Sequence, residues 1–243
     1  MADPHQSYPE FVAGLQDRLP GEAALRNAVG GDFVAEGFLE EQLLRHLGLR
    51  DGAAVIDVGC GSGRLAFQLK RYPTLRYLGT DVVPELVRYA DTLCQREDWE
   101  FRALHENRIP APDACADFVC FFSVLTHLSH EDSFRYLAEA HRVLRPEGRI
   151  VLSFLEFRLA AHWPVFAAAL DPATGRTHLN QFIERDALSA WALHLGLVVE
   201  TVYDGDRPHI PLEADVVWPD GRRMSGLGNL GQSVAVLRRP SAP

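Results

Sequence analysis

The sequence lacks several features that would assign it to a specialised class of protein. It has four cysteines in 243 residues and no CxxC pair, so we expect reduced, partly buried thiols rather than a disulfide framework. No window approaches the ~18 apolar residues of a membrane-spanning helix. The first residues, MADPHQSYPEF, have no basic start followed by an apolar stretch, so we expect no signal peptide. These absences favour a cytoplasmic protein without a membrane partner.

Positive charge is also scarce. The formal net charge is -9 and no run of basic residues occurs, whereas tight binding to nucleic-acid phosphates needs the opposite sign. We therefore expect no nucleic-acid partner. Hydrophobic residues make up 47% and charged residues 23%, which is ordinary for a globular protein. No repeat, low-complexity tract or linker is visible, so we expect a single domain.

Strand-like and helix-like segments alternate through the middle of the chain. Short apolar runs predict strands at 53–58, 76–80, 99–103, 117–123 and 149–154. Helical spacing predicts helices between them at 64–71, 84–95 and 129–144. This alternation predicts an α/β fold with a parallel sheet and right-handed crossovers. Outside it we expect helices at 37–47 and 185–195, strands at 197–203 and 232–238, and a long polar loop between those two strands.

The segment VIDVGCGSGRL places a glycine-rich turn between a strand and a helix, where open α/β sheets bind ligands. A dinucleotide site, G-x-G-x-x-G, would fit Gly59 and Gly61, but Arg64 stands in place of the last glycine. We expect Arg64 to lie at the surface. Asp57 precedes the turn and would repel a pyrophosphate but attract a cation. Asp81, at the end of the next strand, is placed to bind ribose hydroxyls. The pattern favours a cationic nucleoside without phosphate, with a dinucleotide as the alternative.

Four segments resemble the motifs of class I S-adenosyl-L-methionine (SAM)-dependent methyltransferases, in the family's order. They are VIDVGCGSGRL, YLGTDVVPELVRYA, ADFVCFFSVLTHL and RVLRPEGRIVLSF. The resemblance covers about residues 30–154, and LGQSVAVLRRP is similar to the family's last, antiparallel strand. It implies a three-layer Rossmann-like sandwich with a seven-stranded, mostly parallel sheet. The regions would be a helical cap (1–50), a SAM-binding core (51–154), a substrate-shaping insert (155–182) and a C-terminal helix with strands (183–243).

The resemblance also implies a set of cofactor-binding residues. The methionine end of SAM would lie on the glycine turn and under the NAVGGDF stretch, the ribose on the second-strand acid, and the adenine beside it. Relatives often place an acid after the third strand, and here a histidine and a glutamate occupy that place. The cofactor-binding residues implied are Gly30, Asp57, Gly59, Cys60, Gly61, Gly63, Asp81, Val82, His105, Glu106 and Ser123.

Two residues are candidates for catalysis because they follow strands four and five. His127 in SVLTHL is our candidate general base, although a histidine at the start of a helix can also serve packing. Glu156 in SFLEF is a candidate for orienting or deprotonating the substrate, with a solvated loop acid as the alternative. Asp204, Asp206 and His209 have metal-ligand chemistry, but a polar turn explains the same letters and we expect no metal.

The insert after the fifth predicted strand carries aromatic and amide side chains. Trp163, Phe166, His178, Asn180 and Gln181 are candidates for the roof of an acceptor pocket. The alternative is that the aromatic residues pack the insert against the sheet.

We interpret the sequence as a SAM-dependent methyltransferase of a small molecule, with a hydroxyl of a sugar, phenol or other biosynthetic intermediate as acceptor. The acidic-Pro-Pro-Tyr motif of adenine and amide N-methyltransferases is replaced by FSVL. The alternatives are N- or C-methylation of a small metabolite, a non-catalytic SAM-binding regulatory module, and an NAD-dependent reductase. The oligomeric state is not predicted.

Overall fold

The computed structural model describes residues 4–19, 21–170 and 179–241, and its centre is a seven-stranded sheet. The strand order is β3-β2-β1-β4-β5-β11-β6. The strands are β1 (Ala54–Val58), β2 (Arg76–Asp81), β3 (Glu100–Ala103), β4 (Ala116–Phe121), β5 (Leu144–Phe154), β6 (Val198–Tyr203) and β11 (Ser233–Arg238). Each lies where a strand was predicted, although β5 begins earlier than 149.

The pairing also agrees with the prediction. β1 to β5 pair in parallel, and β11 runs antiparallel to both β5 and β6, between which it lies. The order reverses between β1 and β4. Open parallel sheets bind ligands at such a switch point, beyond the carboxyl ends of the strands.

Helices cover both faces of the sheet. Alternate strand residues face opposite ways, so Val55 packs into one core with α3 and α4, and Ile56 packs into the other with α6 and α8. This two-sided burial explains why the strands are continuous apolar runs. The helices that form the layers are α3 (Phe33–His46), α4 (Arg64–Leu69), α5 (Pro84–Cys94), α6 (His130–Val143) and α8 (Arg185–His194).

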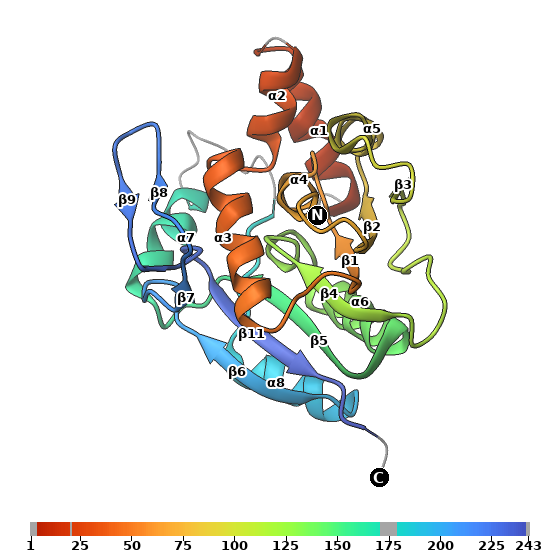
Figure 1. Ribbon diagram of the computed structural model, residues 1–243. Coiled ribbons are helices and arrows are strands. Elements are labelled where there is room, and N and C mark those ends of the chain that lie inside the picture. The colour runs from red at the N-terminus through yellow and green to blue at the C-terminus, as the bar shows by residue number, and fades with distance from the viewer. Residues whose placement is uncertain (1–3, 20, 171–178, 242–243) are drawn as a thin grey trace.

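The remaining elements lie around the sandwich. Figure 1 shows α1 (Pro4–Gln16) and α2 (Gly21–Ala28) together at one end of the molecule, near α5. α7 (Trp163–Ala169) and the short 3₁₀ turns η1 (Leu125–His127) and η2 (Ala160–His162) complete the helical elements.

The long loop expected between β6 and β11 contains two small antiparallel sheets, which the sequence did not predict. The first pairs β7 (Ile210–Pro211) with β10 (Leu227–Gly228), and the second pairs β8 (Val216–Val217) with β9 (Arg223–Met224). Two-residue strands are too short to show a periodic pattern. Among the described residues, no helix is long and apolar enough to cross a membrane.

Candidate functional site

The glycine turn between β1 and α4 is closely packed. Gly59 and Gly61 have φ angles of 72° and 54°, in the left-handed region that side chains rarely adopt. A β-carbon at Gly59 would lie 2.4 Å from Cγ2 of Val124, and one at Gly61 would lie 2.3 Å from Cγ1 of Val29. Only glycine fits at either position. The turn is therefore a backbone surface held between residue 29 and the loop that follows β4.

Asp81 holds this turn from the end of β2. Its Oδ2 accepts a hydrogen bond from the Gly61 N–H (2.9 Å) and its Oδ1 accepts one from the Val83 N–H (2.9 Å). Burial raises the pKa of the Asp81 carboxyl, and the backbone donors oppose that rise because they favour the charged form. Each carboxylate oxygen keeps further lone pairs, so Asp81 can also accept from ligand hydroxyls.

Asp57 is buried in β1 beneath the turn. The Tyr77 hydroxyl donates to its Oδ2 at 2.8 Å. Burial raises the pKa of Asp57 to about 7, and nearby Glu40 adds to the rise while the Tyr77 hydrogen bond lowers it. A carboxyl in this state gains its full charge only when a positive group approaches or the pH rises.

The turn opens into a cavity of about 540 Å³ at the carboxyl ends of β1, β2 and β4. Its lining includes four acids, Asp57, Asp81, Glu36 and Glu40, and one arginine, Arg64. Burial raises the pKa of Glu36 to about 7. The negative excess favours a positively charged ligand and disfavours a phosphate.

Arg64 is not at the surface as predicted, because its side chain is only 11% exposed. Its Nη2 pairs with Oε1 of the buried Glu40 at 2.5 Å, and its Nη1 donates to the carbonyls of Val29 (3.1 Å) and Gly30 (3.0 Å). The guanidinium thus joins α3, α4 and the stretch around residue 30, which forms one wall of the cavity. Glu36 and Glu40 are four residues apart on α3, but charged helix residues are usually solvated, so the half-buried position of Glu36 and the burial of Glu40 were not predicted.

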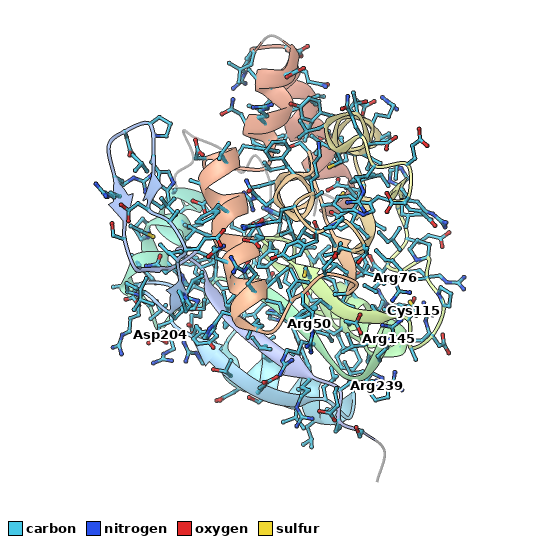
Figure 2. The ribbon with its side chains drawn as sticks, in the orientation of Figure 1. Arg50, Arg76, Cys115, Arg145, Asp204 and Arg239 are labelled. Carbon is cyan, nitrogen blue, oxygen red and sulfur yellow. The ribbon has the colours of Figure 1, made fainter. Side chains whose placement is uncertain are left out.

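Other basic residues lie at the opposite end of the sheet. Arg50, Arg76 and Arg145 stand near the beginnings of β1, β2 and β5, and Arg239 follows the antiparallel β11. Figure 2 shows all four at the lower end of the molecule. They are therefore remote from the cavity at the carboxyl ends of the parallel strands.

Comparison with known proteins agrees with this geometry. Residues 56–152 match the family described as a methyltransferase domain. A malonyl-[acyl-carrier protein] O-methyltransferase of Hahella chejuensis is 32% identical over 152 residues, covering 59% of this chain and 50% of that protein. A ubiquinone biosynthesis O-methyltransferase of Xanthomonas axonopodis pv. citri is 31% identical, covering 62% and 65%. The chain therefore spans less than two thirds of these relatives.

A solved SAM-dependent methyltransferase of Aquifex aeolicus has the same fold, with a TM-score of 0.57, 19% identity, and coverage of 95% of this chain and 97% of that one. Residues 56–152 are therefore similar to a methyltransferase domain, within a fold shared with the class I SAM-dependent methyltransferases. The family's cofactor is SAM, whose sulfonium and ammonium groups are positive and which has no phosphate. The acidic cavity and the turn that excludes side chains fit such a ligand.

The cavity is lined by most of the residues predicted to bind the cofactor, but not by all. Leu104 lines it, whereas the neighbouring side chains of His105 and Glu106 are exposed and lie outside the lining. The loop turns these two residues outward after β3. The predicted residues that do line the cavity are Gly30, Asp57, Gly59, Cys60, Gly61, Asp81, Val82 and Ser123. Gly63 lies behind the turn, against Ala90 of α5.

His127 lines the cavity from η1. Its Nδ1 lies 2.8 Å from the carbonyl oxygen of Leu179, and its ring stacks on Tyr8, with 5.5 Å between centroids and 25° between planes. A carbonyl oxygen only accepts, so Nδ1 carries the proton and Nε2 carries the lone pair in the neutral ring. Tyr8, from α1, was not identified from the sequence, because α1 contains Pro9 and has no clear apolar stripe.

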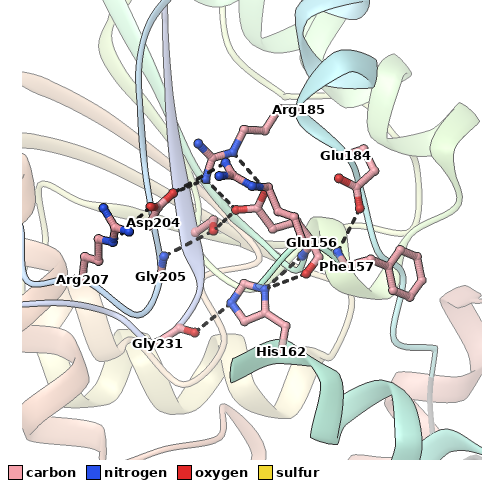
Figure 3. Close-up of polar contacts among 11 residues, drawn as sticks. Glu156, Phe157, His162, Glu184, Arg185, Asp204, Gly205, Arg207 and Gly231 are labelled. Carbon is pink, nitrogen blue, oxygen red and sulfur yellow. Dashed lines mark hydrogen bonds and ion pairs between the residues drawn. The ribbon is translucent and has the colours of Figure 1, made fainter. Parts of the chain in front are cut away.

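Glu156 follows β5 as predicted, but it does not reach the cavity lining. It is fully buried, and Arg185 of α8 donates to its two carboxylate oxygens from Nε (2.9 Å) and Nη2 (2.7 Å). The Ser233 hydroxyl also donates to it. Figure 3 shows Arg185 between Glu156 and Asp204. A carboxylate with these partners joins β5, α8 and β11, so the geometry places Glu156 in the framework rather than beside an acceptor.

His162 lines the cavity and was not identified from the sequence. Its Nδ1 accepts from the Glu156 N–H (3.0 Å) and its Nε2 donates to the Gly231 carbonyl (3.1 Å), as Figure 3 shows. Both ring nitrogens are therefore used by the backbone. His162 is therefore held in place by the backbone and is not our candidate base.

The insert contributes Ala161, Val165 and Asn180 to the lining, but Trp163 and Phe166 lie outside it. Both rings pack with Phe157 and with each other, and Phe166 also packs with Phe182. The side chain of Gln181 faces His130, and His178 lies outside the described residues.

The candidate metal ligands after β6 have other partners. Asp204 pairs with Arg185 and lies near Arg158 and Arg207, while His209 stacks on Tyr203. Within the described parts of the chain, no group of three or more acidic, histidine or cysteine side chains is arranged to hold a metal ion.

Proposed function

We propose that this protein is a SAM-dependent methyltransferase that methylates a hydroxyl oxygen of a small molecule. The observation that carries the proposal is the acidic cavity beside the glycine turn, which Asp57, Asp81 and Glu36 line. Two relatives named as O-methyltransferases support the choice of oxygen. SAM supplies an activated methyl group when bound.

The residues on the cofactor side would bind through charge and shape. Asp57 would accept from the methionine ammonium group beside the turn, Asp81 would accept from the ribose hydroxyls, and Val82 would contact the adenine. Arg64 would hold the stretch around Gly30 over this end. Enclosure of the reacting groups lets positioning supply much of the rate acceleration.

On the acceptor side, His127 would act as the general base. Its Nδ1 is held by the Leu179 carbonyl at 2.8 Å and its ring lines the cavity, so the imidazole would take the proton of an acceptor hydroxyl at Nε2. Residues 155–182 would shape the acceptor pocket through Leu155, Ala161 and Val165. Glu156 has no part in this proposal because Arg185 and Ser233 occupy its oxygens.

Two measurements test the proposal. Isothermal titration calorimetry should show saturable binding of S-adenosylhomocysteine and no binding of NADH. Incubation of the protein with SAM and a panel of phenols, sugars and amines should release S-adenosylhomocysteine with at least one hydroxyl compound. Binding without turnover would favour a regulatory SAM-binding module, and binding of NADH alone would favour a reductase.

A further inference from the structure

Three uncharged polar side chains form a hydrogen-bonded chain across the cavity wall. Ser123 follows β4, Ser153 lies in β5, and Gln232 precedes β11, and all three line the cavity. The Ser123 N–H lies 2.7 Å from Ser153 Oγ, Ser153 Oγ lies 2.8 Å from Gln232 Oε1, and Gln232 Nε2 lies 3.1 Å from Ser123 Oγ. The chain therefore begins and ends on Ser123.

The direction of each hydrogen bond follows from the chemistry of the partners. Ser153 Oγ accepts from the backbone N–H of Ser123, and its own proton goes to Gln232 Oε1. The Gln232 amide nitrogen then faces Ser123 and donates to its hydroxyl oxygen. The opposite amide orientation would leave the proton of Ser153, which is only 2% exposed, without an acceptor. In the favoured orientation, none of these three hydrogen bonds takes the hydroxyl proton of Ser123.

The backbone places Ser123 at the boundary between the cofactor turn and the acceptor wall. Its φ of 60° is unusual for a residue with a side chain, and Thr126 Oγ1 fixes the conformation by donating to the Ser123 carbonyl at 2.8 Å. The next residue, Val124, packs against Gly59 of the turn. Such strain is retained where the surrounding structure demands it, often at functional sites.

We propose that Ser123 is a specificity residue that donates a hydrogen bond to the reacting oxygen of the acceptor. This inference rests on the proposed function and narrows it to uncharged phenols and comparable hydroxyl compounds. An oxygen nucleophile can accept this hydrogen bond and keep a second lone pair for the methyl group. A neutral amine has a single lone pair, so the same donor would block its attack. Ser123 thus selects oxygen over nitrogen.

The surrounding charges exclude an anionic acceptor. Among the described lining residues Arg64 is the one arginine or lysine, and it is bonded to Glu40 and to two carbonyls at the cofactor end. The lining from the insert and the segment before β11 is uncharged at Leu155, Val165 and Leu230, which offer apolar surface. An uncharged ring with one hydroxyl matches this combination.

The test measures the ionisation of 4-nitrophenol bound to the complex of the protein with S-adenosylhomocysteine, followed by absorbance across a pH series. A hydrogen-bond donor at the phenol oxygen favours the phenolate, so Ser123→Ala should raise the pKa of the bound phenol by about one unit. Gln232→Glu should also raise it, because a carboxylate accepts the Ser123 proton and turns it away from the cavity. The matched control is Gln181→Glu, whose side chain faces His130, and it should leave the value unchanged.

Each outcome decides the matter. An equal pKa for the bound phenol in the native protein, Ser123→Ala and Gln232→Glu would overturn the role of Ser123. Failure of 4-nitrophenol to bind a complex that does hold S-adenosylhomocysteine would overturn the acceptor class and leave the proposed function standing. Failure of S-adenosylhomocysteine to bind would remove the proposed function itself. Near-ultraviolet circular dichroism of each variant shows that the fold is retained.

Discussion

Replacement of Asp57 by asparagine tests two effects of its buried charge separately: the loss of stability of the ligand-free protein and the gain in affinity for the cofactor. Asp57 is 3% exposed, and the Tyr77 hydroxyl donates a hydrogen bond to its carboxylate. An asparagine oxygen can accept the same hydrogen bond without ever being charged. We therefore expect Asp57→Asn to stabilise the ligand-free protein at high pH and to weaken cofactor binding.

The size of the effect follows from the raised pKa of about 7, against an ordinary value of 3.8. The native carboxyl holds its proton more tightly than the unfolded one, so its contribution to stability falls as pH rises between these two values. One pKa unit corresponds to about 1.36 kcal/mol. The free energy of unfolding that the native protein loses through Asp57 therefore grows from about 1.7 kcal/mol at pH 5 to about 4.3 kcal/mol at pH 8.5. Asparagine does not ionise, so the variant does not lose this stability. The difference in unfolding free energy between the two proteins should therefore increase by about 3 kcal/mol from pH 5 to pH 8.5.

Urea unfolding of the ligand-free proteins at several pH values measures this difference directly. The free energy of unfolding of Asp57→Asn, minus that of the native protein, should rise steadily over this range. Calorimetry at pH 8.5 should show S-adenosylhomocysteine binding about 10- to 100-fold more weakly to the variant, because its ammonium loses a charged partner. The same exchange at the exposed Asp91 is the control and should change stability by less than about 0.5 kcal/mol.

A difference in unfolding free energy that stays constant from pH 5 to pH 8.5 would refute the raised pKa. Unchanged affinity for S-adenosylhomocysteine would refute the role of Asp57 in binding. The two results are independent, because the first concerns the ligand-free protein and the second concerns the complex.

Three further changes test other parts of the site. Gly61→Ala should lower the free energy of unfolding by about 1–3 kcal/mol in urea, because its β-carbon meets Val29; Gly14→Ala, in open space on a helix, should raise it by up to about 1 kcal/mol. Arg64→Ala should lower the free energy of unfolding by about 3–5 kcal/mol in the same assay, because it leaves the buried Glu40 without its positive partner. A decrease below about 1 kcal/mol would contradict the burial of this ion pair. His127→Gln should lower kcat by about 10²–10⁴-fold with any hydroxyl acceptor, and an unchanged kcat would exclude it as the base.

The sheet could be predicted because its strands are buried on both faces and are bounded by turn residues. Segments such as 53–58 leave few alternatives, since an apolar run that ends in glycines cannot continue as a helix. The glycine turn and Asp81 could be predicted for the same reason. Their conformation is local, and their spacing along the chain sets their contacts.

The remaining parts depend on contacts between distant segments. The burial of Arg64 requires Glu40 and the carbonyls of residues 29 and 30, and a single sequence does not show that these meet. The position of Glu156 outside the cavity lining depends in the same way on its hydrogen bonds with Arg185, which lies 29 residues later. The exposed positions of His105 and Glu106 could not be predicted, because both follow a short edge strand where no periodic pattern indicates the direction of a side chain.

The position of β11 inside the sheet has a consequence for protein synthesis. β6 pairs with β11 and not with β5, so it can join the sheet as a strand only after residues 233–238 have left the ribosome. The wall that Gln232 completes is therefore assembled after the glycine turn. A chain that ends shortly before residue 232 would keep the glycine turn, but β5 would have an unpaired edge. Its cavity would lack the part of the wall that Gln232 and β11 provide.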